Sequence, residues 1–244
     1  DQYRNSQEGR FTRITWGYNV IGQFTSQEQI NDYPVNIDGQ GNRTLLPGDL
    51  IYADVNGDGK INELDERPIG YGTGNQPNIN FGFSIAVYYR NFDLHADFSG
   101  AAGYTWFANW ETRWPFQNDG NLNTMFLDRW HRENPFDPKS QWIPGKYPAL
   151  RFNDGGHSNY NRPSTFWAVN AKYLRARTLE LGYSIPSKLL NAVKMTKARF
   201  YINAYNLFSF DNLREYHIDP ELIDENGLQY PQNKFLNVGV NLTF

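Results

Sequence analysis

Residues 54–65 read DVNGDGKINELD and place oxygen-bearing side chains at alternate positions. Gly59 stands at the sixth position, where a sharp turn requires a residue without Cβ. A hard cation takes six or more oxygen ligands at roughly 2.3–2.6 Å, and this spacing wraps such ligands around one point. The motif therefore predicts a structural calcium (or magnesium) ion. The expected ligands are Asp54, Asn56, Asp58, the backbone carbonyl of Lys60, Asn62 and Asp65.

The loop departs from the usual calcium pattern at its last position. Asp65 replaces the bidentate glutamate, and its shorter side chain predicts weaker binding or fewer ligands. Residues 71–74 (Tyr-Gly-Thr-Gly) follow soon after, so the flanks do not read as paired helices. We expect a clamp that stiffens a loop rather than a sensor. The alternative is an acidic, Asn- and Gly-rich turn that binds no metal.

Tryptophan is concentrated in one part of the chain. Five of the seven tryptophans lie in residues 102–165, among Asn, Asp and Arg. Such aromatics could contact a sugar or peptide substrate, form a protein interface, or pack the long segment onto itself. The sequence leaves these alternatives open. The five residues are Trp106, Trp110, Trp114, Trp130 and Trp142.

Catalytic residues are not evident in the sequence. The four histidines are scattered, and no HExxH or GxSxG motif occurs. Asp219 and Glu221 place two carboxylates close together, but no partner for them can be identified. We therefore expect that the protein is not an enzyme.

Composition and charge exclude several classes of protein. The chain has 244 residues and a net charge of −3, which argues against a nucleic-acid binder. No apolar run approaches the roughly 18 residues that a membrane-spanning helix needs. Aromatic residues make up 16% of the chain, and they favour strands. The composition thus predicts an all-β chain with long polar loops.

Six segments alternate between apolar and polar residues, as half-buried or lipid-facing strands do. The last is the clearest, with Leu236, Val238 and Val240 on one face. An apolar face of this kind meets a second sheet in a soluble sandwich, and lipid in a membrane barrel. The six expected strands cover residues 11–24, 80–89, 92–99, 166–183, 197–208 and 234–244.

The connections between these strands separate the two possibilities. Residues 90–91 and 186–193 form short connections on one side. Residues 25–79, 102–165 and 209–233 form long loops on the other side, if the strands alternate in direction. Short turns on one rim and long loops on the other are typical of outer-membrane barrels, whereas such long loops are uncommon in compact soluble domains. The pattern favours antiparallel transmembrane β-barrel strands with long extracellular loops.

Several short motifs occur along nearly the whole chain, beginning with Pro47-Gly48-Asp49, which leads into the acidic loop. The others are Phe92–Gly100, Arg129-Trp130 with Glu133-Asn134-Pro135, Tyr147-Pro148, Tyr173-Leu174-Arg175, Leu181-Gly182-Tyr183, Asn206-Leu207, Asp219-Pro220-Glu221 and Phe244. The order and spacing of these motifs resemble those of SusC/RagA-family TonB-linked outer-membrane transporters.

This resemblance implies that residues 1–244 form the C-terminal segment of a plugged barrel of about 22 strands, without the plug. It implies import of oligosaccharides or peptides across the bacterial outer membrane. A SusD-like lipoprotein would cover the extracellular mouth, TonB would act through the plug, and the barrel-assembly machinery would read Phe244. The competing hypothesis is a secreted, soluble, calcium-stabilised β-sandwich that binds carbohydrate. That hypothesis predicts Phe81, Phe83 and Leu94 buried against another sheet.

Overall fold

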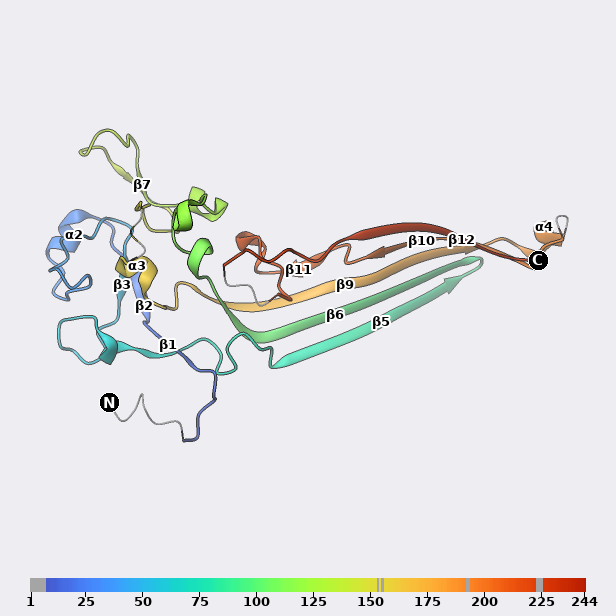
Figure 1. Ribbon diagram of the computed structural model, residues 1–244, viewed down its shortest axis with the longest axis horizontal. Coiled ribbons are helices and arrows are strands. Elements are labelled where there is room, and N and C mark those ends of the chain that lie inside the picture. Colours follow the sequence, from blue (N-terminus) through green and yellow to red (C-terminus); the bar gives the residue numbers. More distant parts are fainter. Residues whose placement is uncertain (1–7, 153, 155, 192–193, 223–225) are drawn as a thin grey trace.

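The computed structural model describes residues 8–152, 154, 156–191, 194–222 and 226–244. The molecule is elongated: a long antiparallel sheet forms one part, and loops with short elements form the other (Figure 1). We call this second part, made of the described residues in 8–78 and 108–167, the loop body. The C-terminus lies at the end of the sheet that is farthest from the loop body (Figure 1).

The main sheet has the strand order β12-β10-β9-β6-β5, and β11 also pairs with β9. All pairings in it are antiparallel. The sheet confirms five of the six expected strands and the antiparallel all-β fold class. It corrects the start of the second long loop, because β6 continues to Phe107. The strands are β5 (Ile79–Tyr89), β6 (Phe92–Phe107), β9 (Ala168–Ser184), β10 (Lys197–Tyr205), β11 (Ser209–Asp211) and β12 (Phe235–Thr243).

The prediction of a barrel strand over residues 11–24 was wrong. This segment forms β1 (Thr15–Gly17) and β2 (Val20–Gln23), which pair with β4 (Arg67–Ile69) and β3 (Leu50–Tyr52) inside the loop body. Between β1 and β2, Tyr18 donates its backbone N–H to the carbonyl of Pro163 at 2.8 Å. The alternation in the sequence has a local cause, because Tyr18 and Phe24 are buried in a core of the loop body.

Short helices and hairpins complete the loop body and the tight turns. Among the described residues, no helix is long and apolar enough to cross a membrane. The remaining elements are α2 (Gln27–Asn31), η1 (Glu63–Asp65), η2 (Trp110–Thr112), η3 (Gln117–Asp119), η4 (Thr124–Leu127), β7 (His131–Arg132), β8 (Trp142–Ile143), α3 (Ser158–Asn161), α4 (Ser187–Leu190) and η6 (Arg214–Tyr216).

Two hydrophobic cores lie at the loop-body end rather than along the sheet. One is built within residues 18–61 around Phe24, Ile37 and Tyr52, which are fully buried. The other joins the end of β6 to the long loop that follows it and to residues 213–218. Its largest members are Tyr104, Trp106, Phe126, Tyr147, Tyr160, Trp167 and Tyr216.

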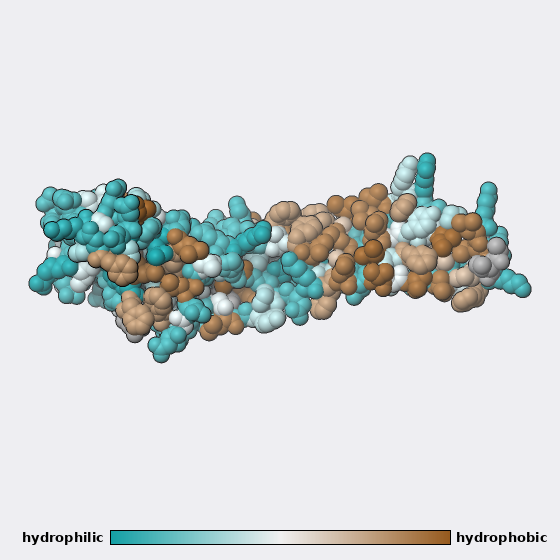
Figure 2. Space-filling model, turned by 90° about the horizontal axis from the view of Figure 1, so that it is seen from above, coloured by the Kyte–Doolittle hydropathy of each residue, from teal (hydrophilic) through white to brown (hydrophobic). Residues whose placement is uncertain are grey.

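One face of the sheet is an uncovered apolar surface. The register aligns one row of aliphatic side chains across all five long strands: Val87, Leu94, Leu181, Ile202 and Val238. These side chains are between 39% and 78% exposed. Phe81 and Phe83 are each 45% exposed, which is not the burial that a soluble two-layer sandwich predicts. Figure 2 shows apolar side chains gathered along the sheet, whereas the loop body is mainly hydrophilic.

A β-bulge in β9 changes which residues share a face. Ala176 lies opposite Phe98 and Thr178 lies opposite Asp97, so Arg177 is the extra residue. Before the bulge, Arg175 lies on the polar face; after it, Thr178 and Glu180 do. An extra residue of this kind reverses the alternation along the strand. The bulge therefore lets Arg175 and Arg177 join one polar network.

Candidate functional site

The apolar face carries aromatic side chains at both ends and aliphatic side chains between them. Near the tight turns, Phe92 and Tyr183 pack with ring centroids 4.7 Å apart. Near the loop body, Phe83 and Phe98 stack at 4.9 Å. On β5, the apolar face from Phe81 to Tyr89 spans eight residue steps, about 26 Å along the strand. The lipid-facing surface of an outer-membrane barrel has the same pattern, an apolar band about 25 Å tall between two aromatic girdles.

The opposite face of the sheet is polar and charged. Near the tight turns, the guanidinium of Arg199 donates to Asp93 (3.1 Å from Nε to Oδ1) and to Glu180 (2.7 Å). His95 lies in the same polar row as Glu180 and Asn203. One arginine therefore links β6, β9 and β10 on this face and offsets part of the charge of the two carboxylates.

At the other end of the polar face, residues 213–222 fold back across β9; we call them the inner strap. Arg175 of β9 donates to Asp219 at 2.6 Å and to Glu221 at 3.1 Å. Arg177 donates to the other oxygen of Glu221. The side chains of Asp219, Glu221 and Arg175 are only 5%, 8% and 6% exposed. The structure thus pairs the two carboxylates for which the sequence suggested no partner.

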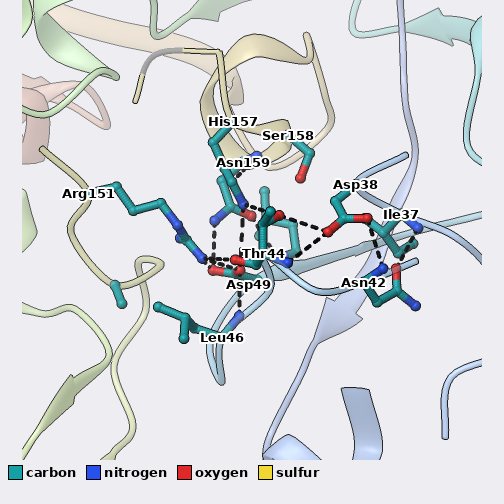
Figure 3. Close-up of polar contacts among 12 residues, drawn as sticks. Ile37, Asp38, Asn42, Thr44, Leu46, Asp49, Arg151, His157, Ser158 and Asn159 are labelled. Atoms are coloured by element: carbon teal, nitrogen blue, oxygen red, sulfur yellow. Dashed lines mark hydrogen bonds and ion pairs between the residues drawn. The ribbon is translucent and has the colours of Figure 1, made fainter. Parts of the chain in front are cut away.

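A second buried charge fastens the two halves of the loop body together (Figure 3). Asp49 is fully buried, and Arg151 donates to its two carboxylate oxygens at 2.9 and 2.5 Å. Asn159 Nδ2 (2.7 Å) and the backbone N–H of Leu46 (2.8 Å) also donate to this carboxylate. Asp49 therefore links the loop before β5 to the loop after β6.

His157 lies beside this buried carboxylate. Its Nε2 is 4.0 Å from Asp49 and 3.4 Å from the hydroxyl of Thr44 (Figure 3). Burial lowers the pKa of His157 below its ordinary value of 6.5, and the nearby Arg151 lowers it further. Its Nδ1 accepts the backbone N–H of Asn159 and so caps α3. The neutral ring therefore fits this site better than the charged one.

The acidic loop is closed by hydrogen bonds between carboxylates and backbone amides. Asp54 accepts the N–H groups of Gly57 (2.8 Å) and Gly59 (2.8 Å), and both glycines have positive φ. Asp58 accepts the N–H of Lys60 at 2.9 Å, and the side-chain amides of Asn56 and Asn62 at 3.0 Å each. The side chains of Asn56 and Asn62 therefore contact Asp58, and Asp54 is held against the backbone of the same loop.

Asp65, the expected ligand at the last position, already has a structural role. It is fully buried, and it accepts the N–H groups of Val55 (2.8 Å) and Asn62 (2.9 Å). The bond from Asn62 is half of a capping box that starts η1. Within the described part of the chain, no group of three or more His, Cys, Asp or Glu side chains is placed to hold a metal ion. Metal binding by this loop stays a prediction.

Sequence comparison finds relatives that are named TonB-dependent receptors. TonB-dependent receptor P3 of Formosa agariphila is 25% identical over 265 aligned residues, which cover 100% of this chain. TonB-dependent receptor P26 of the same organism is 27% identical, over 97% of this chain. No protein-family profile matches.

Solved structures show the same fold. The RagAB peptide importer in its closed-closed state matches 95% of this chain with a TM-score of 0.56 and 21% identity. Its open-open state matches 95% with a TM-score of 0.54 and 20% identity. The chain is SusC/RagA-like. It covers 24% and 23% of the two receptors and 23% and 22% of the two RagAB chains, so it spans about a quarter of their length.

The five tryptophans of this SusC/RagA-like chain do not form one surface. Trp106 belongs to β6 and is 3% exposed, with its ring 4.8 Å from that of Tyr216. Trp114 donates its indole N–H to the carbonyl of Tyr160 at 2.8 Å. Trp130 is 7% exposed. These three pack the loops onto themselves, which was one of the alternatives for them.

Trp110 and Trp142 are more accessible. Trp110 is 47% exposed, and Trp142 is half-buried beneath the guanidinium of Arg132, 4.7 Å from its ring.

The terminal Phe244 is 82% exposed and follows β12, whose Thr243 pairs with Lys197. The pair of Asp49 and Arg151 has no signal in the sequence beyond the Pro47-Gly48-Asp49 motif, which contains one of its members.

Proposed function

We propose that the chain forms the C-terminal barrel strands of a TonB-dependent outer-membrane importer. The single observation that carries the proposal is the uncovered apolar face with aromatic side chains at both ends. An apolar band with two aromatic girdles suits lipid, and the polar face with its ion pairs suits a hydrated lumen. The receptor names of the relatives and the fold of RagAB support the same function.

The sheet has two open edges, β5 and β12. Open edges are not tolerated in the hydrocarbon region of a bilayer, because their backbone groups would lack partners there. We therefore propose that other strands of the same transporter pair with both edges and close a barrel of about 22 strands around a plug. TonB would act through that plug.

The orientation follows from the two ends of the sheet. The tight turn at residues 90–91 and the short helix α4 would face the periplasm, and the loop body would face the outside. A SusD-like surface lipoprotein would then dock on the loop body and cover the mouth. The cargo would be an oligosaccharide or a peptide, and Phe244 would serve as the strand signal for barrel assembly.

We also propose that residues 54–65 hold a structural calcium ion. The fit rests on the donor set: Asp54 and Asp58 are carboxylates, Asn56 and Asn62 supply amide oxygens, and Lys60 supplies a carbonyl. The amide groups that now bond to Asp58 could rotate to offer oxygen instead. Such an ion would further stiffen a loop whose backbone N–H groups already bond to the carboxylates of Asp54 and Asp58.

The test is to isolate the protein from its native outer membrane in mild detergent and to identify co-migrating proteins by mass spectrometry. Recovery of further barrel and plug sequence together with a SusD-like lipoprotein supports the proposal. Recovery of a lone 28.3 kDa species that needs no detergent would overturn it. That result would favour the soluble, calcium-stabilised carbohydrate-binding sandwich.

A further inference from the structure

The inner strap, residues 213–222, lies on the polar face of β9 and is fixed there at several points. Asp219 and Glu221 are held by Arg175 and Arg177, as described above. In addition, Tyr104 of β6 donates its hydroxyl to the carbonyl of Pro220 at 2.7 Å. Because these contacts come from two neighbouring strands, the strap is attached to the sheet itself and not only to other loops.

The segment that returns from the strap toward β12 is tied to the same carboxylates. Gln232 donates its backbone N–H to Asp219 at 3.1 Å and its side-chain amide to Glu221 at 2.6 Å. At the other end of the strap, Leu213, Tyr216 and Ile218 are buried in the core that contains Trp106. The strap is thus held by a buried core at one end and by buried charges at the other.

Two cavities adjoin the strap, and Pro220 lines both of them. One of about 490 Å³ is lined by Pro220, Glu221 and Leu222 of the strap and by Asn80 of β5. The other, of about 440 Å³, is lined by Asp219 and Pro220. Asn80 belongs to the polar face, since it pairs with Ala101 two residues from Ser99. The strap therefore forms part of the wall of two cavities, and one of them reaches the polar face at Asn80.

We propose that the inner strap is a size filter: it narrows the extracellular mouth of the lumen and sets the largest cargo that can pass. This inference rests on the proposed import function, in which the polar face lines the lumen. Arg175 and Arg177 are then positioning residues, because they hold the strap rather than contact the cargo. Leu222 faces the first cavity and is one of the residues that the cargo would meet.

The experiment uses the complete transporter with its lipoprotein, expressed in cells. The probes are two fluorescein-labelled series of increasing length, one of oligopeptides and one of oligosaccharides. The measured quantity is the longest probe that enters the periplasm. In the double variant Arg175→Gln/Arg177→Gln, Asp219 and Glu221 lose their cationic partners, and the strap should leave the polar face. We expect a longer cut-off and at least threefold more uptake of probes just above the wild-type limit.

A second variant should act in the opposite direction without disturbing the ion pairs. Leu222→Trp adds bulk to the wall of the first cavity, so we expect a shorter cut-off. The matched control is Arg199→Gln, which also removes a guanidinium bonded to two carboxylates of the polar face, far from the strap. Its cut-off should equal that of the wild type. Heat-modifiable migration on gels checks that each variant is folded.

Opposite shifts in the two strap variants, with no shift in the control, support the size filter. Unchanged cut-offs in folded Arg175→Gln/Arg177→Gln, or in Leu222→Trp if the double variant does not fold, would overturn it while leaving the import function intact. An equal shift in Arg199→Gln would also overturn it, because the effect would then follow from luminal charge. Failure of the wild type to take up any probe would overturn the proposed function and this inference together.

Discussion

Arg151 donates to both carboxylate oxygens of Asp49, at 2.9 and 2.5 Å, across 102 residues of sequence. The side chain of Asp49 is fully buried, and that of Arg151 is 10% exposed. The pair therefore joins two loops that leave the sheet at different strands. These hydrogen bonds explain why an acidic residue, Asp49, is tolerated in a buried position directly after Gly48.

Removing one member of this pair should loosen the loop body strongly. Asp49→Ala leaves Arg151 without its anionic partner in a buried site, which costs about 3–5 kcal/mol. The unfolding of the loop body in urea, followed by tryptophan fluorescence, measures the change. The matched control is Lys146→Gln, because Lys146 and Glu215 form an ion pair whose side chains are 45% and 46% exposed. Its loss should cost less than about 1 kcal/mol. Equal losses in both variants would contradict this role for Asp49.

Gly48 should be intolerant of any side chain for two separable reasons. Its φ is +93°, and an added Cβ would lie 2.2 Å from Cγ of Trp130. Gly57 has a similar φ of +75°, but an added Cβ there would meet nothing within 4 Å. Gly57→Ala thus reports the cost of the backbone conformation alone, about 1–2 kcal/mol. Gly48→Ala should lower stability by clearly more, measured by the same urea titration. Similar losses would show that Trp130 moves aside freely.

The long strands could be predicted because their alternation continues over many residues. Val87 and Leu181, for example, lie in regular patterns that only a strand satisfies. The alternation of residues 11–24 is as regular, yet it serves a local core around Tyr18 and Phe24. Alternation with a period of two identifies a strand with one apolar face. It does not show whether that face packs in a local core or lies against lipid.

The polar contacts of the candidate site could not be predicted, because they join residues distant in sequence. Arg175 and Asp219 are separated by 44 residues, and the β9 bulge at Arg177 decides which side chains share the polar face. Neither the bulge nor the return of the strap has a local sequence signal. The end of β6 at Phe107 was also missed, since Gly100, Gly103 and a register shift between Ala101 and Tyr104 interrupt the alternation before the buried Trp106.

The acidic loop gives a prediction about metal. Replacing Asp54 and Asp58 together by alanine should remove a bound calcium ion, with the barrel strands left intact. Elemental analysis of the purified transporter measures the metal, and protease resistance of the loop body with and without chelator measures its effect. Glu28→Gln changes an acidic residue of the loop body outside the motif and serves as the control. Unchanged metal content in the double variant would contradict the site.

Stability of the loop body should depend on pH through His157. Its pKa in the folded state lies below the ordinary 6.5, so the unfolded chain binds more protons between these two values. The stabilisation is therefore complete above pH 6.5 and decreases as the pH falls toward the folded pKa. Melting followed by tryptophan fluorescence at pH 7.5 and 5.5 measures the difference. His157→Asn keeps a side chain that can cap α3 and should reduce the dependence on pH. If His157→Asn kept the pH dependence of the wild type, a titratable group other than His157 would be responsible for it.

The two faces of the sheet can be distinguished at neighbouring positions of β5. Ile85 lies on the apolar face midway between Phe81 and Tyr89, and Ala86 lies opposite His95 on the polar face. An arginine on a lipid-facing strand near the bilayer midplane costs about 2–4 kcal/mol, whereas a hydrated lumen accepts it. Ile85→Arg should therefore reduce the fraction of transporter that is heat-modifiable and assembled in the outer membrane, and Ala86→Arg should not. The two variants carry the same charge one residue apart, so general effects on synthesis are matched. Equal assembly of both variants would mean that lipid does not cover the apolar face.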